Sequence, residues 1–240
     1  MDILASMIDI IRLATGIIIL SYASITDIKT RTASNYLWVI IAVIGAVLLA
    51  VEYLLPQIQL QNLLYLVFIP VMIIMVYVFY QLRLIFGGAD AKALMALTIL
   101  APLTPEIDIF PLYPTLMPFP WVILANSVIM FLFIPLGFLI FNISKKQMKF
   151  PNILLGYKMD IKKAREKFVW PLEIFENDKR KFQYMPKEID IVKQLDKFEE
   201  KNISKIWVTP KIPFMIPLLV GYIVSFIIGD ILFTAINYLF

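Results

Sequence analysis

The chain of 240 residues contains no histidine and no cysteine. Without histidine there is no imidazole base, no Ser-His-Asp triad and no HExxH zinc site. Without cysteine there is no thiol nucleophile, no disulfide framework and no cysteine-based zinc or iron–sulfur module. Any catalysis by this chain therefore rests on carboxylates, hydroxyls, Lys, Tyr or a hard cation held by oxygen atoms.

Charge is also scarce, because 17% of the residues are charged whereas 60% are hydrophobic and the mean hydropathy is +0.82. A soluble domain with a solvated surface does not carry this composition. We therefore interpret the chain as an integral membrane protein. Its first residues include Asp2 and Asp9 in place of a basic n-region and a small-residue cleavage site, so we expect the first apolar segment to be retained as a span.

Six apolar segments are candidate membrane spans, since a bilayer crossing needs about 20 such residues. They lie near 3–26, 36–55, 61–82, 91–109, 119–141 and 212–238. The segment 91–109 is the weakest, because Pro102 and Pro105 interrupt it. Six spans with both termini outside place every basic segment in the cytoplasm, as the positive-inside rule requires. We therefore expect a multi-pass protein of the cytoplasmic membrane.

Residues 145–211 are predicted to lie in water outside the membrane, because they hold 17 of the 22 Lys and Arg residues together with 10 acidic ones. The net charge of +7 favours topology anchoring ahead of binding to anionic headgroups. Within it, a helix is predicted over 187–201, and the stretches ILLGY and KIWVT are typical of strands. The apolar positions of this helix recur every three residues: Ile189, Val192, Leu195 and Phe198.

These patterns predict an all-α polytopic membrane protein with six transmembrane helices and a small α+β cytoplasmic domain inserted before the last helix. The expected organisation is a membrane domain over 1–143, a cytoplasmic soluble domain over 144–211 and a sixth transmembrane helix over 212–240. The lipid bilayer is the expected surrounding, and the sequence has no nucleic-acid signature and gives no oligomeric state.

Charged residues at membrane depth are costly, by about 2.5–3.5 kcal/mol each, so each needs a reason. The candidates are Asp9, Arg12, Asp27, Asp90, Lys92 and Asp230. Asp9 and Arg12 are three residues apart and predict an intrahelical ion pair. For Asp230 we expect a structural hydrogen bond to another span.

Asp27 and Asp90 lie at span ends on the same side of the membrane in this topology. Alone, Asp27 is typical of a span boundary and Asp90 of an N-cap, with Gly87 and Gly88 supplying the turn before it. Together they indicate more, because two neighbouring carboxyl groups cannot both ionise cheaply. One keeps its proton while the other stays charged, which gives an acid and a base in one site.

Two motifs carry these aspartates. The first is D-x-K-x-R-x-x-x-N, with Asp27, Lys29, Arg31 and Asn35, and the second is GGADAKAL at 87–94, which contains Asp90 and Lys92. The pair resembles the G-x-G-D aspartyl peptidases of type IV prepilins and archaeal preflagellins. The motif of that family has a second glycine where this chain has Ala89.

The resemblance implies an aspartyl endopeptidase in which Asp27 and Asp90 activate water against a peptide carbonyl. It implies site-supporting roles for Gly87, Gly88 and the polar motif residues, although headgroup anchoring explains the basic ones equally well. The implied substrates are membrane-anchored preflagellin or prepilin-like precursors with a short positively charged leader, cut at the cytoplasmic face. We expect no cofactor and no metal. Because the four-cysteine module of bacterial prepilin peptidases is absent, the archaeal form with peptidase activity alone is favoured.

Three other functions remain open at this stage. A proton- or cation-coupled transporter also uses intramembrane carboxylates, but such proteins place them near the midplane and show duplicated halves. A membrane scaffold would need neither aspartate. An intramembrane protease of the presenilin type shares the G-x-G-D element, but its first motif has a Tyr where this chain has Thr26.

Overall fold

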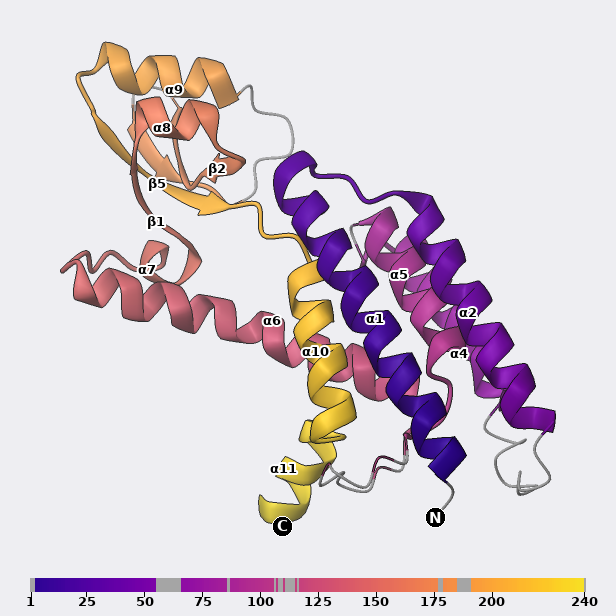
Figure 1. Cartoon of the computed structure of the whole chain (residues 1–240). Helices are drawn as coiled ribbons and strands as arrows, with labels where there is room; N and C mark the ends of the chain where they lie inside the picture. The colour runs from indigo at the N-terminus through magenta and orange to yellow at the C-terminus, as the bar shows by residue number, and fades with distance from the viewer. Residues whose placement is uncertain are drawn as a thin grey trace. The chain divides into compact units, whose positions relative to one another are not determined.

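The computed structural model of the chain describes residues 3–54, 66–85, 87–105, 107, 110, 115, 117–176, 179–184 and 191–239. These residues are mostly helical and divide into two compact units (Figure 1). The helical unit comprises Met1–Phe131 and Pro213–Phe240, and the sheet unit comprises Leu132–Ile212. The prediction of a mainly helical membrane protein with a small sheet-containing insert is confirmed at this level.

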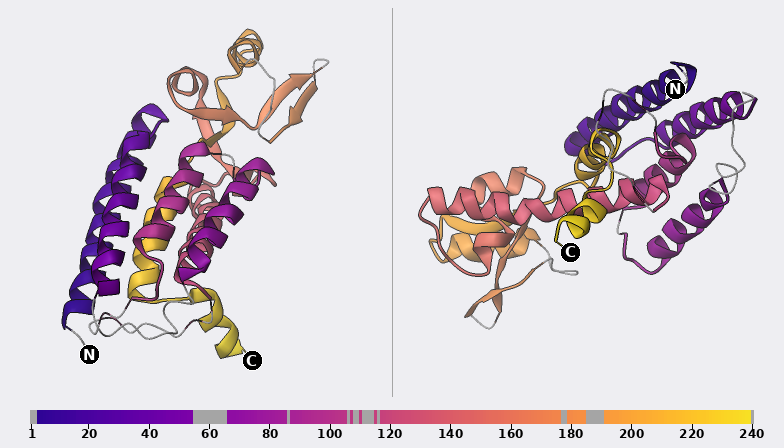
Figure 2. Two further views of the ribbon diagram at one scale, coloured as in Figure 1. Left: turned by 90° about the vertical axis from the view of Figure 1, so that its right-hand side faces the viewer. Right: turned by 90° about the horizontal axis from the view of Figure 1, so that it is seen from below.

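The helical unit contains α1 (Ile3–Thr30), α2 (Asn35–Leu54), α4 (Phe68–Gln81), α5 (Gly88–Leu100), the first part of α6 (Phe119–Ser144), α10 (Met215–Ile227) and α11 (Ile231–Leu239). Of these, α1, α2, α4, α5 and α10 lie side by side, whereas α6 runs across them (Figure 1, Figure 2). Among the described residues, α1, α2 and α6 are long and apolar enough to cross a membrane, and α4 and α10 are shorter apolar helices. Their exposed sides are covered with Ile, Val, Leu and Phe, as lipid contact favours.

Three predicted spans differ from the helices observed. The segment near 61–82 forms a helix only over Phe68–Gln81, and its beginning lies outside the described residues. The segment near 91–109 is helical over Gly88–Leu100 and ends before Pro102, because the residue before a proline is driven away from helical angles. The segment 212–238 is divided between α10 and α11, because Gly229 has a φ of 88°.

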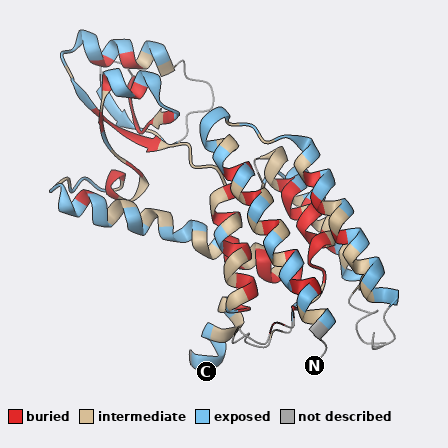
Figure 3. Cartoon of the chain, viewed as in Figure 1, coloured by how far each residue is buried: buried red, intermediate tan, exposed pale blue. Residues whose placement is uncertain are grey.

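The buried core of the helical unit centres on α5 (Figure 3). This helix packs most extensively on α2 and also on α4. At Gly45 of α2 the two backbones approach so closely that a Cβ atom would lie 2.5 Å from the Cα atom of Leu100. Small residues permit such close approach between membrane helices. The sequence of α2 thus fixes how α5 sits, and α5 carries Asp90.

Replacing Gly45 by Ala is expected to destabilise the helical unit by about 1–3 kcal/mol, because the added methyl group meets backbone that cannot rotate away. The measurement is the apparent melting temperature in detergent micelles, followed by circular dichroism. Gly137→Ala in α6 is the matched control, since a Cβ there meets nothing within 4 Å. Equal melting temperatures for the two variants would contradict this account of the α2–α5 contact.

The sheet unit contains α7 (Asn152–Leu155), β1 (Tyr157–Asp160), α8 (Ile161–Glu166), β2 (Val169–Pro171), β3 (Glu173–Glu176), β4 (Lys179–Phe182), α9 (Ile191–Glu200) and β5 (Lys205–Pro210). Its three-stranded antiparallel sheet has the order β1-β5-β2, with Met159 opposite Ile206 and Pro171 opposite Val208. β3 and β4 form a separate hairpin. The unit has its own apolar core beneath α9.

The predictions within the sheet unit are partly confirmed. KIWVT lies in β5, and the amphipathic helix is present as α9 with Leu195 and Phe198 buried. Val192, predicted on the buried face, is exposed, and Ile189 lies outside the described residues. Most of ILLGY is not a strand. Its first residues form α7 because the Asn142 side-chain amide donates hydrogen bonds to the carbonyl groups of Ile153 and Gly156 and holds a turn there.

Candidate active site

Asp27 lies in the last turns of α1, where it is half-buried. The helix ends just beyond it, because Arg31 adopts a left-handed conformation with a φ of 58°. The backbone N–H of Arg31 donates a hydrogen bond of 3.0 Å to the carbonyl oxygen of Asp27. The charge of Arg31 also attracts the Asp27 carboxylate. At the end of α1, the Asp27 carboxylate therefore has Arg31 as a cationic neighbour and remains partly exposed.

Asp90 lies in the first turn of α5, and it is also half-buried. The N-cap of α5 is Gly87, with no side-chain hydrogen bond at the cap, so the interpretation of Asp90 as the N-cap is wrong. The carboxyl group instead folds back over Gly87, where a Cβ atom would lie 2.1 Å from Asp90 Oδ2. Its place in the first helical turn still favours negative charge through the helix dipole.

The structure brings these two aspartates into electrostatic range of one another, since the charge of Asp27 acts on the carboxyl group of Asp90. Their helices α1 and α5 contact one another directly. Two carboxylates at this range repel one another when both are ionised, so the state in which only one of them is charged is favoured. The arrangement can therefore supply an acid and a base from two side chains of the same type.

A second contact joins the two sequence motifs. Lys92 Nζ donates a hydrogen bond of 2.9 Å to Asn35 Oδ1, which links the N-terminal part of α5 to the first residue of α2. Both side chains are exposed. The hydrogen bond thus joins the first motif, which contains Asp27, to the second motif, which contains Asp90.

The other predicted site residues have separate surroundings. Lys29 is exposed in the last turn of α1. A Cβ on Gly88 would lie 3.4 Å from the hydroxyl of Tyr80, an ordinary contact. Ala89 is helical and is not among the residues with positive φ, so alanine fits without strain at the position where the family motif has glycine. Among the described residues, no three carboxylates gather as a metal site would require.

The other acidic and basic residues predicted at membrane depth, Asp9, Arg12 and Asp230, have partners of their own. The predicted pair of Asp9 and Arg12 is confirmed, with a distance of 2.9 Å between Oδ1 and Nη1. Asp230 accepts hydrogen bonds from the Thr115 hydroxyl, which lies outside the helices, and from the backbone N–H of Phe233 at the start of α11. Sequence reasoning missed Glu52, which pairs with Arg12. The sequence feature that could have indicated Glu52 is that it is the one carboxylate in the apolar segment 36–55.

The described residues form a mainly helical protein with long apolar helices, and comparison with known families places the chain among peptidases. The model of the type IV leader peptidase family matches residues 14–136, which include both aspartates. A second model, described as the archaeal peptidase A24 C-terminus type II, matches residues 148–231. The chain belongs to the type IV leader peptidase family.

Curated relatives agree with this assignment over most of their length. The chain is 31% identical to a preflagellin peptidase of Methanocaldococcus jannaschii over 236 residues, covering 93% of this chain and 95% of the relative. Identity is 30% to the preflagellin peptidase of Methanococcus maripaludis, covering 93% and 96%. It is 28% to that of Methanococcus voltae, covering 90% and 94%.

Proposed function

We propose that this chain is a membrane-embedded aspartyl endopeptidase that removes the short positively charged leader from preflagellin or type IV prepilin-like precursors. The observation that carries the proposal is that Asp27 and Asp90 lie at the ends of the contacting helices α1 and α5, within the region matched by the family model. The names of the relatives at 28–31% identity support preflagellin as the substrate class. A transporter is not favoured, because the family consists of peptidases.

In this mechanism the ionised member of the pair takes a proton from a water molecule as its oxygen attacks the scissile carbonyl carbon. The protonated member polarises the carbonyl oxygen and then gives a proton to the leaving amine. The water supplies the hydroxyl group of the new carboxyl terminus and the proton of the new amine, so the hydrolysis balances without a further reactant. Gly87, Gly88, Lys29, Arg31, Asn35 and Lys92 support the pair in this proposal.

The proposed topology has six spans, formed by α1, α2, α4, α5, α6 and the segment 212–240, with both termini outside. The proposed membrane domain covers 1–143, and the proposed cytoplasmic domain covers 144–211. The distribution of basic residues supports this arrangement, since 17 of the 22 Lys and Arg residues lie within 145–211. It places Asp27 and Asp90 at the cytoplasmic face, where the leader of a membrane-anchored precursor meets its hydrophobic helix.

The test is cleavage, in detergent micelles, of a precursor that has a basic leader ending in Gly followed by an apolar helix. We expect the purified chain to release the leader, with product masses that identify the bond after the leader. The same precursor with its leader lysines and arginines replaced by glutamine is the matched substrate control and should be cut more slowly. Failure to cut a panel of preflagellin-like and prepilin-like precursors would contradict the proposal.

A further inference from the structure

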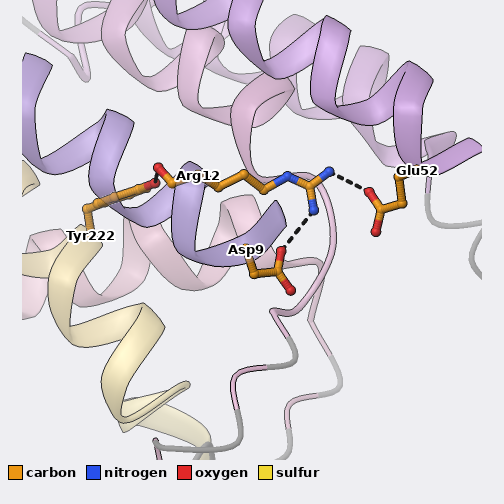
Figure 4. Close-up of polar contacts among 4 residues, drawn as sticks. All are labelled: Asp9, Arg12, Glu52 and Tyr222. Atoms are coloured by element: carbon orange, nitrogen blue, oxygen red, sulfur yellow. Dashed lines mark hydrogen bonds and ion pairs between the residues drawn. The ribbon is translucent and has the colours of Figure 1, made fainter. Parts of the chain in front are cut away.

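Arg12 carries a charge that is almost completely buried in the helical unit, since 1% of its side chain is exposed. Its guanidinium group lies between two carboxylates (Figure 4). Nη1 donates to Asp9 Oδ1 at 2.9 Å, and Nη2 donates to Glu52 Oε2 at 2.5 Å. Burying three charged groups costs free energy that apolar side chains of the same size would not cost. Because the cluster of Arg12, Asp9 and Glu52 is present despite this cost in stability, we look for a role of these residues other than stabilising the fold.

The helices that meet at this cluster fall into two groups. α1 packs most extensively on α10, and Tyr222 of α10 donates its hydroxyl hydrogen to the backbone carbonyl of Arg12 at 2.7 Å. α5 packs on α2 and α4, whereas its contact with α1 is small. Asp27 belongs to the first group and Asp90 to the second. α1 also packs directly on α2, and the ion pair of Arg12 with Glu52 is a buried charged contact within that packing, because Glu52 lies on α2.

Arg12 and Asp27 lie on one continuous face of α1. The buried positions Arg12, Gly16, Leu20 and Ala23 follow one another at intervals of three or four residues, and Asp27 continues the series. Arg12 is about four turns, or about 22 Å, from Asp27 along the axis. A continuous helix transmits an axial displacement along its length, so the position of Arg12 against α2 sets the position of Asp27 against α5.

We propose that Arg12 and Glu52 are positioning residues that fix α1 along the axis of α2, and thereby fix the separation of Asp27 and Asp90. Neither side chain touches the aspartates, so they act through the helices. This inference rests on the proposed peptidase function for its effect on turnover. The effect of Arg12 and Glu52 on the distance between the two helix groups can be measured without any substrate.

The absence of cysteine allows a direct distance measurement. We would introduce cysteines at Tyr22 on α1 and Leu82 at the end of α4, which are 57% and 65% exposed, and attach nitroxide labels for pulsed electron spin resonance. Glu52→Gln is expected to shift or broaden the distance distribution by about 1–2 Å or more, a typical helix displacement. Without the spin labels, the same substitution should lower kcat at least about tenfold and leave KM within about twofold.

Two further variants separate positioning from a general structural role. Glu52→Asp retains the charge, so the wild-type distance distribution and most of the turnover should return. Tyr222→Phe removes a hydrogen bond within the first helix group and should leave the distance unchanged. An unchanged distribution in Glu52→Gln, or equal effects of Gln and Asp, would overturn the proposal. A changed distance in a chain whose wild type cuts no precursor would leave the helix link standing and refute the proposed function.

Discussion

Asp27→Asn and Asp90→Asn should each lower the rate of leader cleavage by about 10³-fold or more. Asparagine has nearly the same shape as aspartate, but it neither accepts the proton of the attacking water nor supplies one to the leaving amine. Because acid and base are the two members of one pair, loss of either member disables both steps. Product formation over time, quantified by mass spectrometry under single-turnover conditions, measures the change.

The control for this prediction is Asp196→Asn in the sheet unit, which removes an exposed carboxylate that pairs with Arg165. It should leave the cleavage rate within about twofold, because exposed ion pairs contribute little. Gel filtration and melting temperature should match the wild type for all three variants. A folded variant at Asp27 or Asp90 with a near wild-type rate would show that the pair is structural.

Gly87→Ala should lower kcat by about 10²-fold while the protein stays folded. The new methyl group would occupy the space of Asp90 Oδ2, at 2.1 Å from the Cβ position. Since that oxygen is the end of a rotatable side chain, the fold can accommodate the methyl group by turning the carboxyl group away. A displacement of a reacting group by about 1 Å costs on the order of 10²-fold in rate. The separate values of kcat and KM test this.

Gly88→Ala is the matched control, because the same methyl group one residue later would lie 3.4 Å from the Tyr80 hydroxyl in ordinary contact. Its cleavage rate should fall by a few-fold at most, far less than in Gly87→Ala, because the contact by which Gly88 supports the pair still has room for a methyl group. Ala89→Gly, which restores the glycine of the family motif, should also change little, since residue 89 has helical angles. Equal losses in Gly87→Ala and Gly88→Ala would attribute the effect to general flexibility of the loop.

Sequence reasoning located the two motifs because their residue types are chemically constrained. The expectation that Asp27 and Asp90 share one side of the membrane came from the distribution of Lys and Arg. The hydrogen bond between Lys92 and Asn35 could not be predicted, because it depends on how α5 packs against α2. The glycine that permits this packing, Gly45, appears in the sequence only as one small residue in an apolar helix.

Other features were decided by tertiary contacts. Glu52 was overlooked because a lone carboxylate near the end of an apolar segment is typical of a span boundary, and its partner Arg12 is far away in the sequence. The break after α10 follows from the positive φ of Gly229, whereas hydropathy averaged over the segment gives no sign of it. Hydropathy identifies apolar segments well, but it does not show where each helix begins and ends.

The short connection between α1 and α2 limits how far Asp27 and Asp90 can move apart. α1 ends at Thr30 and α2 begins at Asn35, which is itself hydrogen-bonded to Lys92 of α5. Residues 31–34 reach no further than about 3.3–3.6 Å each when fully extended. They therefore keep the end of α1, which carries Asp27, close to the start of α2. Through Asn35, the start of α2 is in turn held to α5, which carries Asp90. Lengthening this connection with glycines would widen the range of distances between Asp27 and Asp90 without changing any side chain around them.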